Sequence, residues 1–596
     1  MATYQAPLRD VRFCVEELLD YPGHYARLGG AAAELSAMEV AAICEEVARF
    51  ARHALAPLNV SADTEGASCE AGRVTSPRGF AAAYRQYVEG GWPRLGNAAE
   101  HGGHEAPYSL KLAVSEFMQA ANQAWCMYAL LNDGAIKTLS RFAAPEQIAA
   151  FVPKLVSGEW LSTMCLTEPQ CGSDLSLVRC RAEATAHGTY RITGTKIFIS
   201  SGEQDFTDNI VHLVLARLPD APAGTRGISL FVVPKRRIER QGEAGALNAI
   251  RCLSIEHKMG LRASATCVMA FDGAEGWLVG EPNRGLSAMF VFINKSRLGA
   301  AQQAHAQAEA SFQVAHAYAQ ERLAGRAPGG PLQPDTPADP LLAQPDIRRM
   351  LYTQQSIAAG GRALVLYCAQ WADLADGGDE ATRMRAERRL ALLTPIAKGV
   401  VSEWGTEAAD LGIQVLGGHG YIKEWAQEQR LRDVRITRIY EGTTAIQAMD
   451  LLDRKILGPY RADLQQLTQE ILDSIDTGAV SSMGDALRSA VALWRAVTER
   501  LEQSRHDPGL IPAIAVDYLM LAGYVLVGWM WLRSARVAQE KLAGSALDAD
   551  FYRGKLRTAR FYFEKLLPRI SLHAALIDAG GDCLREAPSN PAAGGS

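Results

Sequence analysis

The stretch Ile436-Thr437-Arg438-Ile439-Tyr440-Glu441-Gly442-Thr443-Thr444-Ala445-Ile446-Gln447 decides how the rest of this chain is interpreted. It places one acidic residue, Glu441, between an apolar and aromatic run and a Gly-Thr turn. Burial raises the pKa of a carboxylate because it penalises the charged form, and such a carboxylate can act as a general base near neutral pH. The alternative is a solvated residue at the start of a helix, so the remaining motifs have to decide.

Length and composition indicate a globular protein of several domains. The chain has 596 residues, 48% of them hydrophobic and 21% charged, which exceeds what a single compact core holds. A net charge of −5 gives no general attraction to nucleic acids or anionic membranes. The eleven scattered cysteines include no Cys-x-x-Cys pair, which favours free thiols in a reducing compartment and no zinc site. The N-terminus lacks the pattern of a signal peptide, so we expect a cytoplasmic protein.

The spacing of apolar residues changes twice along the chain. Helical spacing, as in Val40–Phe50, gives way near residue 161 to β-branched and aromatic runs such as Ile210–Arg217, and helices resume near residue 285. The Pro/Gly-rich segment Ala324–Gln344 is expected to be a surface loop between two long helices. We therefore predict a mainly α protein with a central β-domain, divided into an N-terminal arm (1–35), a helical domain (36–160), the β-domain (161–281), a helical bundle (282–458) and a further helical domain (459–596) whose end, 588–596, is disordered.

Three other segments allow more than one interpretation. Asp10–Leu19 has the pattern of a short amphipathic helix, which we expect to pack on a later domain. Tyr518–Leu532 is very apolar but shorter than the roughly 20 residues of a membrane span, so a buried helix is favoured over membrane contact. The loop Glu100–His104 holds two histidines without further ligands at suitable spacing, so we expect a plain loop and no metal.

Five motifs besides the Glu441 stretch occur together. They are Met164-Cys-Leu-Thr-Glu-Pro-Gln-Cys-Gly-Ser-Asp174, Lys196-Ile-Phe-Ile-Ser-Ser-Gly202, Asn294-Lys-Ser-Arg-Leu-Gly-Ala-Ala301, Glu321-Arg-Leu-Ala-Gly-Arg326 and Gln414-Val-Leu-Gly-Gly-His-Gly-Tyr421. In this order the chain resembles the acyl-CoA dehydrogenase family over about residues 36–458. The arm and the C-terminal extension further resemble a longer bacterial branch, which includes dehydrogenases of 3-methylmercaptopropionyl-CoA and of a broad range of long-chain acyl-CoAs. No Rossmann-type glycine motif is present, so a nicotinamide site is disfavoured.

The resemblance implies an FAD-dependent oxidation of an acyl-CoA. Glu441 would remove the α-proton while the β-hydrogen leaves as hydride to flavin N5, giving a trans-2-enoyl-CoA. The residues implied to contact FAD are Met164, Leu166, Thr167, Gly172, Ser173, Phe198, Ser200, Arg322, Gln414, Gly417, Gly418 and Thr443. Those implied to contact the acyl-CoA are Ser173, Arg297, Tyr440 and Gly442.

The motifs depart from the family pattern in places, and each has a purely structural alternative. Phe198 replaces the usual Trp, Cys171 replaces Ala, and the Phe-Gly that commonly follows the Arg322 position is absent. The alternatives are a tight turn capped by Asp174, a buried strand around the aromatic residue, a solvated arginine in the first turn of a helix, and a Gly-Gly C-cap.

The resemblance also implies partners, and two other functions remain open. An electron-transfer flavoprotein is the expected electron acceptor, and a homodimer the expected assembly. An acyl-CoA oxidase would share the fold and the base but let oxygen reach the reduced flavin. A nucleic-acid-binding flavoprotein of the same fold would need a basic surface. The run Arg553, Lys555, Arg557 and Arg560 spreads around a helix, so a solvated or interface face is favoured and no nucleic acid is expected.

Overall fold

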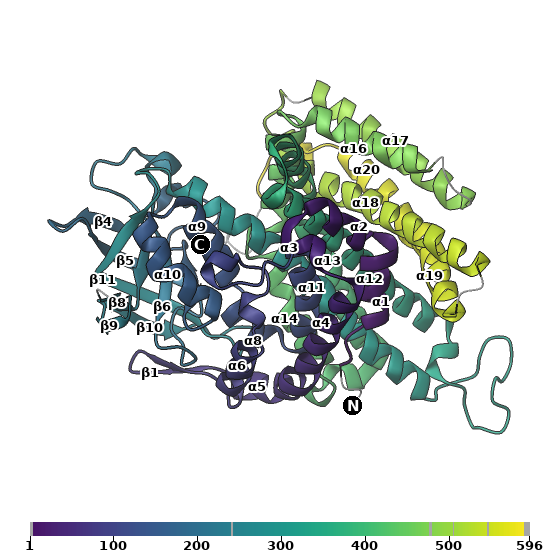
Figure 1. Ribbon diagram of the computed structural model, residues 1–596. Helices are drawn as coiled ribbons and strands as arrows, with labels where there is room; N and C mark the ends of the chain where they lie inside the picture. Colours follow the sequence, from purple (N-terminus) through teal and green to yellow (C-terminus); the bar gives the residue numbers. More distant parts are fainter. Residues whose placement is uncertain (1–3, 240–241, 476–479, 505, 545–546, 589–596) are drawn as a thin grey trace, which may run out of the picture.

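The structure is a computed structural model that describes residues 4–239, 242–475, 480–504, 506–544 and 547–588. Its first part is helical, as the apolar spacing predicts (Figure 1). The capping box of Ser36 and Glu39 starts the helix predicted around Val40. The helices are α1 (Leu8–Arg12), α2 (Tyr21–Leu28), α3 (Gly30–Glu34), α4 (Ala37–Phe50), α5 (Asn59–Glu65), α6 (Phe80–Glu89), α7 (Tyr108–Ala121), α8 (Gln123–Ala129), α9 (Asn132–Phe142) and α10 (Pro145–Ser157).

A twisted β-sheet follows and forms one end of the molecule (Figure 1). Its strand order is β3-β6-β7-β11-β5-β4, with β10 also paired to β11; β3 and β6 are parallel and the other pairs antiparallel. The sheet strands are β3 (Leu161–Cys165), β4 (Arg181–Ala184), β5 (Tyr190–Ser200), β6 (Ile210–Ala216), β7 (Ser229–Pro234), β10 (Ile250–Ile255) and β11 (Thr266–Val279). Two small hairpins lie outside it: β1 (Ser68–Glu70) with β2 (Arg73–Thr75), and β8 (Arg236–Ile238) with β9 (Ala244–Leu247).

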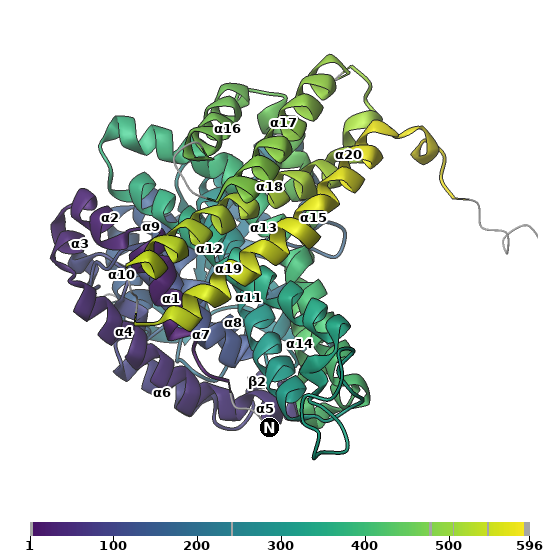
Figure 2. The same ribbon diagram turned by 90° about the vertical axis from the view of Figure 1, so that its right-hand side faces the viewer.

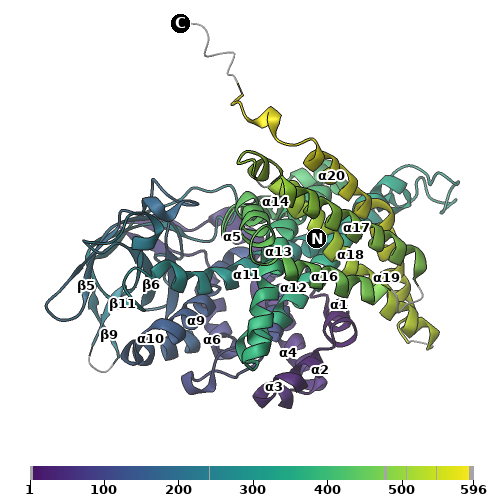
Figure 3. The same ribbon diagram turned by 90° about the horizontal axis from the view of Figure 1, so that it is seen from above.

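Long helices then build the centre of the molecule. Figure 3 shows them between the sheet and the C-terminal helices. Segment 324–344 connects the first two of them without a regular helix or strand longer than one 3-10 turn, as predicted. These helices are α11 (Gly285–Glu321), α12 (Pro345–Gly377), α13 (Glu380–Leu416), α14 (Gln427–Val434) and α15 (Thr444–Met449).

The extension adds α16 (Arg461–Ile475), α17 (Ser481–Gln503), α18 (Leu510–Ala543), α19 (Ala549–Phe561) and α20 (Ile570–Asp578). Helix α18 is long and apolar enough to cross a membrane, with a mean hydropathy of 2.0, yet 72% of its most apolar window is buried inside the protein. Every residue from Tyr518 to Leu532 is buried, which confirms the prediction of a buried helix. The fold is therefore helix–sheet–helix with an extra helical domain, as predicted; residues 589–596, expected to be disordered, lie outside the described residues.

The N-terminal arm packs on the extension and the central helices, as expected. Figure 2 shows α1 beside α19. Asp10 accepts from the Arg362 Nη1 atom of α12 at 2.7 Å and from the Lys555 Nζ atom of α19. The predicted amphipathic helix is not a regular α-helix over its whole length. Helix α1 ends at Arg12, and residues Phe13–Leu18 follow it as a π-helix.

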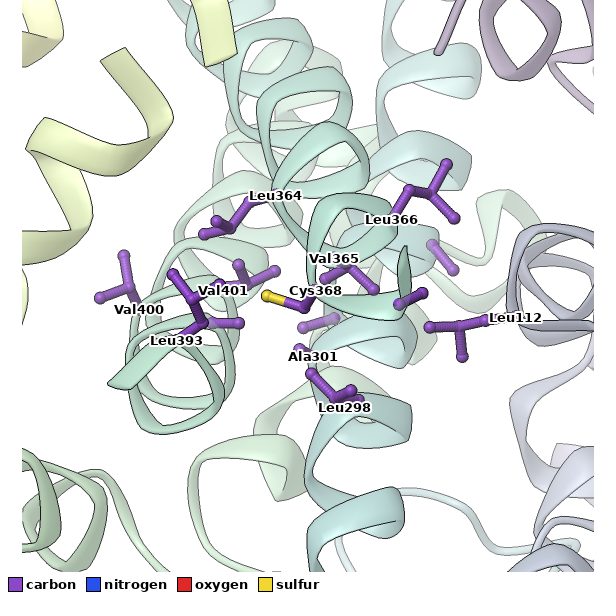
Figure 4. Close-up of a cluster of buried hydrophobic side chains, with 14 of the residues drawn as sticks. Leu112, Leu298, Ala301, Leu364, Val365, Leu366, Cys368, Leu393, Val400 and Val401 are labelled. Atoms are coloured by element: carbon purple, nitrogen blue, oxygen red, sulfur yellow. The ribbon is translucent and has the colours of Figure 1, made fainter. Parts of the chain in front are cut away.

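The core between these layers is made of aliphatic side chains. Figure 4 shows Leu112 of α7, Leu298 of α11, Leu364 of α12 and Val400 of α13 among the buried side chains drawn there. Burial of this apolar surface holds the central helices in fixed relative positions. The rigid scaffold then positions the turn that carries Glu441.

Candidate active site

Glu441 lies on a strained turn between a 3-10 segment, Arg435–Arg438, and helix α15. Its φ is +57° and that of Gly442 is +86°. A left-handed backbone costs a non-glycine residue about 1–2 kcal/mol, so the surroundings must hold it in place. Thr443 contributes by capping α15, since its Oγ1 atom accepts the Ile446 N–H at 3.3 Å.

Glu441 is a half-buried residue, and one oxygen of its carboxylate is removed from water. Its Oε2 atom is buried and has no hydrogen-bond partner among the described residues. Burial raises the pKa of Glu441 to about 7, although the cations of Arg297 and Lys398 act in the opposite direction. A solvated helix-start residue is therefore excluded, and the side chain has the properties of a general base.

Arg297 lies in the interior and not at a first helical turn. Helix α11 begins at Gly285, which packs closely against the backbone of Ser229 and Leu230 of the sheet. Arg297 is therefore in the fourth turn of the helix. The solvated alternative is therefore wrong: Arg297 is 8% exposed, and its Nη1 atom lies 3.4 Å from Asp450 Oδ2. Lys455 Nζ donates to the same oxygen at 2.9 Å. Arg297 consequently places a buried positive charge near Glu441.

Tyr440 is tied to α11 by its hydroxyl. The Tyr440 O–H donates to Gln303 Oε1, and the Gln303 Nε2 atom lies 3.6 Å from the sulfur of Met127 on α8. Burial raises the pKa of Tyr440, so the hydroxyl stays neutral. This chain of contacts links the Glu441 turn to α11 and α8.

A cavity lies among α4, α6, α7, α8, α9 and α11. The volume of this cavity is about 80 Å³. An ion pair of Lys111 and Asp133, at 2.5 Å, lines it, as does Gln302, the neighbour of Gln303. Its large and sulfur-containing lining residues are Tyr84, Tyr87, Trp92, Met118, Trp125 and Cys126. The cavity thus combines an aromatic, polarisable wall with a polar margin.

The second group of predicted residues lies at the end of β3. Met164, Leu166 and Thr167 are half-buried, whereas Thr163 and Cys165, which alternate with Met164 along β3, are buried. Thr167 O accepts the Ile197 N–H at 2.9 Å, which joins the segment to β5. Gly172 and Ser173 are exposed in the turn that follows. Asp174 Oδ1 accepts the Ser176 N–H at 2.9 Å, so the alternative of a tight turn capped by Asp174 also fits this segment.

A buried ion pair beneath this segment went unnoticed in the sequence. Lys196 Nζ donates to Glu168 Oε1 at 2.8 Å and to Leu166 O at 3.0 Å, and both side chains are nearly inaccessible. Glu168 also accepts the backbone N–H groups of Arg179 and Cys180. The sequence shows one acidic and one basic residue beside apolar residues of two motifs, Glu168 and Lys196, but their pairing depends on the fold.

Phe198 projects from a bulge in β5. The register with β11 shifts between Cys267 and Met269, and Phe198 has a φ of +58°. A bulge re-aims a side chain, and the ring of Phe198 is 59% exposed although it belongs to a strand. The buried-strand alternative is therefore wrong for this residue, whereas the neighbouring Ser200 is half-buried.

The remaining predicted residues lie elsewhere on the surface of this chain. Gln414, Gly417 and Gly418 are exposed at the end of α13, and a Cβ atom on either glycine would meet nothing within 4 Å. Gln414 is sixteen residues beyond Lys398, which corresponds to about 24 Å along the helix. Arg322 is exposed at the end of α11. The open surroundings of Gly417 and Gly418 leave room for a ligand.

Comparison with known families gives four consecutive matches along the chain. The descriptions are the N-terminal domain (residues 29–159), middle domain (163–274) and C-terminal domain (283–456) of acyl-CoA dehydrogenase, followed by an acetyl-CoA dehydrogenase C-terminal-like domain (463–588). The chain belongs to the acyl-CoA dehydrogenase family. It is thus an oxidoreductase acting on the CH–CH bond of acyl-CoA thioesters, as predicted.

Two relatives and one solved structure illustrate the family resemblance. The chain is 42% identical to 3-methylmercaptopropionyl-CoA dehydrogenase of Ruegeria pomeroyi, with 98% of this chain and 99% of the relative covered. It is 34% identical to a broad-specificity linear acyl-CoA dehydrogenase of Mycobacterium tuberculosis, covering 85% and 86% of the two chains. The fold matches an acyl-CoA dehydrogenase of Bacillus anthracis complexed with FAD, with a TM-score of 0.72, 19% identity and 94% and 93% of the chains covered.

FAD is the cofactor of this family, and the residues of this dehydrogenase fit it. The exposed ring of Phe198 provides a flat apolar wall in place of the family's Trp. Half-buried Thr167 and Ser200 offer small hydroxyls and backbone groups nearby, suited to the polar edge of a flavin. Among the described residues, no group of three or more His, Cys, Asp or Glu side chains could hold a metal ion. The loop with His101 and His104 is among the residues covered by this statement.

Proposed function

We propose that this dehydrogenase oxidises a short acyl-CoA, with 3-methylthiopropanoyl-CoA as the candidate substrate and Glu441 as the base. The observation that carries the role of Glu441 is its carboxylate, whose Oε2 atom is buried without a hydrogen-bond partner and whose pKa burial raises to about 7. Such a carboxylate can accept a proton without first losing a hydrogen bond. When bound, FAD supplies the two-electron oxidation that accompanies removal of the α-proton.

The chain's own groups would prepare the thioester for proton removal. The Glu441 backbone N–H has no acceptor in the part of the chain that the structure describes, so it is free to donate to the thioester carbonyl oxygen. A donor aimed at that oxygen stabilises the negative charge that develops there as the α-proton leaves. Tyr440, Gly442, Arg297 and Ser173 remain the proposed substrate contacts.

The size and lining of the cavity support a short acyl chain. In this proposal the acyl chain occupies this cavity, and since one water molecule needs roughly 10–15 Å³ by the same measure, the cavity has room for only a few heavy atoms. Sulfur makes favourable contacts with aromatic rings, and Tyr84, Tyr87 and Trp125 line the cavity. The relative from Ruegeria pomeroyi, which carries this substrate in its name, is similar over nearly the whole chain.

We further propose a cytoplasmic homodimer that passes its electrons to an electron-transfer flavoprotein. In this proposal Met164, Leu166, Thr167, Gly172, Ser173, Phe198, Ser200 and Thr443 hold FAD from one subunit. Arg322 and the Gln414–Gly418 turn would meet its phosphate and adenosine end from the other. The open space around Gly417 and Gly418 supports this arrangement, since no described residue of the same chain lies within 4 Å of a Cβ atom placed on either glycine.

The test is anaerobic mixing of the holoenzyme with acyl-CoAs while flavin absorbance is followed. 3-Methylthiopropanoyl-CoA and butyryl-CoA should bleach the flavin at least about tenfold faster than palmitoyl-CoA. Glu441→Gln should retain FAD and lose about 10³-fold in the rate. Equal bleaching by all chain lengths would rule out the short-chain assignment, and an unchanged Glu441→Gln rate would rule out the base.

The acceptor is tested separately. Admitting air to the bleached enzyme should produce little peroxide, whereas an added electron-transfer flavoprotein should restore the absorbance. Rapid peroxide formation would identify an acyl-CoA oxidase instead.

A further inference from the structure

Lys398 is a buried lysine that the reaction described so far does not use. It lies in the middle of α13, its side chain is fully buried, and its Nζ atom donates to Gly442 O at 2.5 Å. A buried ammonium group is costly unless it is paired, and among the described residues this one has a single hydrogen-bond partner, a backbone carbonyl of the strained turn. Burial accordingly lowers the pKa of Lys398 to about 8. A group kept at this cost next to a catalytic turn calls for an explanation.

Gln447 holds the same turn from the other side. Its Nε2 atom donates to Glu441 O at 3.0 Å and to Gly442 O at 3.3 Å. Lys398 and Gln447 thus together fix both carbonyls of a turn in which Glu441 and Gly442 adopt positive φ. Since a misplaced base loses rate steeply, these donors act on the reaction through geometry.

The C-terminal extension closes the space behind these two residues. A Cβ atom on Gly399 would lie 2.5 Å from Leu519 of α18 and 3.5 Å from Gln447 Cβ. A Cβ atom on Gly523 of the same helix would lie 2.4 Å from Val400. Helix α18 therefore packs against α13 beside Lys398 too closely for a side chain at Gly399 or Gly523, and the Lys398 side chain is 0% exposed, so its hydrogen bond to Gly442 lies in the protein interior.

Two charged neighbours of the turn, Arg297 and Glu403, are paired with side chains of opposite charge. On α11, Arg297 faces Asp450, which Lys455 also contacts. On α13, Glu403 pairs with Arg438 at 2.5 Å and accepts the Thr444 O–H at 2.6 Å. Lys398 thus differs from its charged neighbours, because its contact is to the backbone of the base turn and not to a carboxylate.

From this arrangement we propose that Lys398 is a positioning residue for the Glu441 base: its ammonium group locks the Glu441–Gly442 turn and favours the ionised carboxylate. The proposal rests on the proposed role of Glu441. Gln447 is the neutral counterpart, which holds the same turn without adding charge. The C-terminal extension serves both by excluding water behind them.

Three variants test the proposal: Lys398→Met, Lys398→Arg and Gln447→Leu. Each is measured as holoenzyme, with the flavin spectrum and thermal melting as checks of folding, and with the rate of anaerobic flavin reduction against pH at saturating acyl-CoA. Lys398→Met should lower the rate about 10–100-fold at unchanged apparent Kd for substrate. It should also move the kinetic pKa of Glu441 up by about one pH unit, because a nearby cation is lost.

The other two variants separate charge from geometry. Lys398→Arg should restore most of the pH profile of the wild type, since it keeps the charge. Gln447→Leu should lower the rate without the upward movement of the pH profile. The proposal is wrong if Lys398→Met folds and retains both the rate and the profile, or if Lys398→Arg and Lys398→Met have the same profile. If Lys398→Met does not fold, the other two variants decide. A wild-type pH profile for Lys398→Arg together with a lower rate for Gln447→Leu supports the proposal, and a wild-type rate for Gln447→Leu contradicts it. Glu441→Gln tests the role of Glu441 independently. If Glu441 is not the base, Glu441→Gln and the other variants should all be equally active.

Discussion

Glu441 combines two costs that a structural residue would avoid. It adopts a left-handed backbone conformation, and it buries a carboxylate with an unpartnered oxygen. Each of these costs roughly 1–3 kcal/mol and persists only when surrounding groups enforce it. Lys398, Gln447 and the Thr443 cap are those groups.

The protonation state of Glu441 should control the rate. Burial raises the pKa of Glu441 to about 7, and the protonated acid cannot accept the α-proton. The rate of anaerobic flavin reduction should therefore fall about tenfold per pH unit below pH 7 and level off above it. Rapid mixing between pH 5.5 and 8.5 measures this, with the FAD absorbance before mixing as the control for cofactor loss. A flat profile across this range contradicts the assignment.

Phe198 allows a test of the proposed flavin wall. Its ring is 59% exposed, so Phe198→Ala removes little buried surface and should leave the melting temperature of the cofactor-free protein unchanged. FAD affinity should fall by about tenfold, as expected for an aromatic contact of about 1–1.5 kcal/mol. Leu247→Ala is the matched control, because Leu247 is 62% exposed on β9 but was not assigned to the site. Equal FAD affinities for the two variants would remove Phe198 from the site.

At the scale of elements, buried charges join the N-terminal arm to the core. Arg362 of α12 is fully buried and contacts Glu116 of α7, Glu309 of α11 and Asp10 of the arm. Lys555 of α19 shares Asp10 and lies 4.9 Å from the ring centroid of Phe13. Of the predicted basic run, Lys555 is therefore part of an interface, whereas Arg553 and Arg560 form exposed ion pairs with Asp550 and Glu564.

Removing the charge of Asp10 should destabilise the protein strongly. Asp10→Asn leaves Arg362 and Lys555 buried with less compensation, which costs about 3–5 kcal/mol. The control Asp550→Asn removes a partner of an exposed pair and should change stability by less than about 0.5 kcal/mol. Urea unfolding followed by circular dichroism compares them. Equal midpoints would show that the arm is not held by this network.

The same network predicts an acid-sensitive attachment of the arm. Lys555 and Arg362 outweigh burial and lower the pKa of Asp10 below its ordinary value of 3.8. Its contribution to stability is therefore complete above the unfolded-state pKa and is lost as the pH falls through the lower folded-state pKa. Wild type and Asp10→Asn should consequently converge in stability only in strong acid.

At the scale of the whole molecule, a second subunit should complete the cofactor site. Tyr421 is 81% exposed and Ile422 43% exposed, directly after the Gly417–Gly418 turn. Tyr421→Arg should weaken the dimer and lower FAD affinity together, because the proposed interface and the adenosine site share this turn. Light scattering coupled to size exclusion, with FAD content of each peak, tests this. A wild-type monomer with full FAD occupancy would contradict the shared site. The control is Met384→Arg, because Met384 is a 55% exposed residue of α13.

The sequence by itself determined the order of the domains and the identity of the central residues. Apolar spacing distinguishes helices from strands locally, so the strand β6 and the buried helix around Tyr518–Leu532 could be predicted without the fold. Glu441 could be proposed as the base only through the family resemblance of the joint motifs, since its own stretch also fits a solvated residue at a helix start. The substrate contacts remained predictions, since they depend on residues distant in the chain.

Only the tertiary structure decided how the base is held. The partners of the Glu441 turn come from α13 and α15. The helix packed behind them is α18, more than a hundred residues from Lys398 in the chain. The burial of Arg297 and the pairing of Lys196 with Glu168 likewise arise from packing between separate elements. Desolvation and hydrogen bonding depend on every group that surrounds an atom in space, and most of those groups are not its neighbours along the chain.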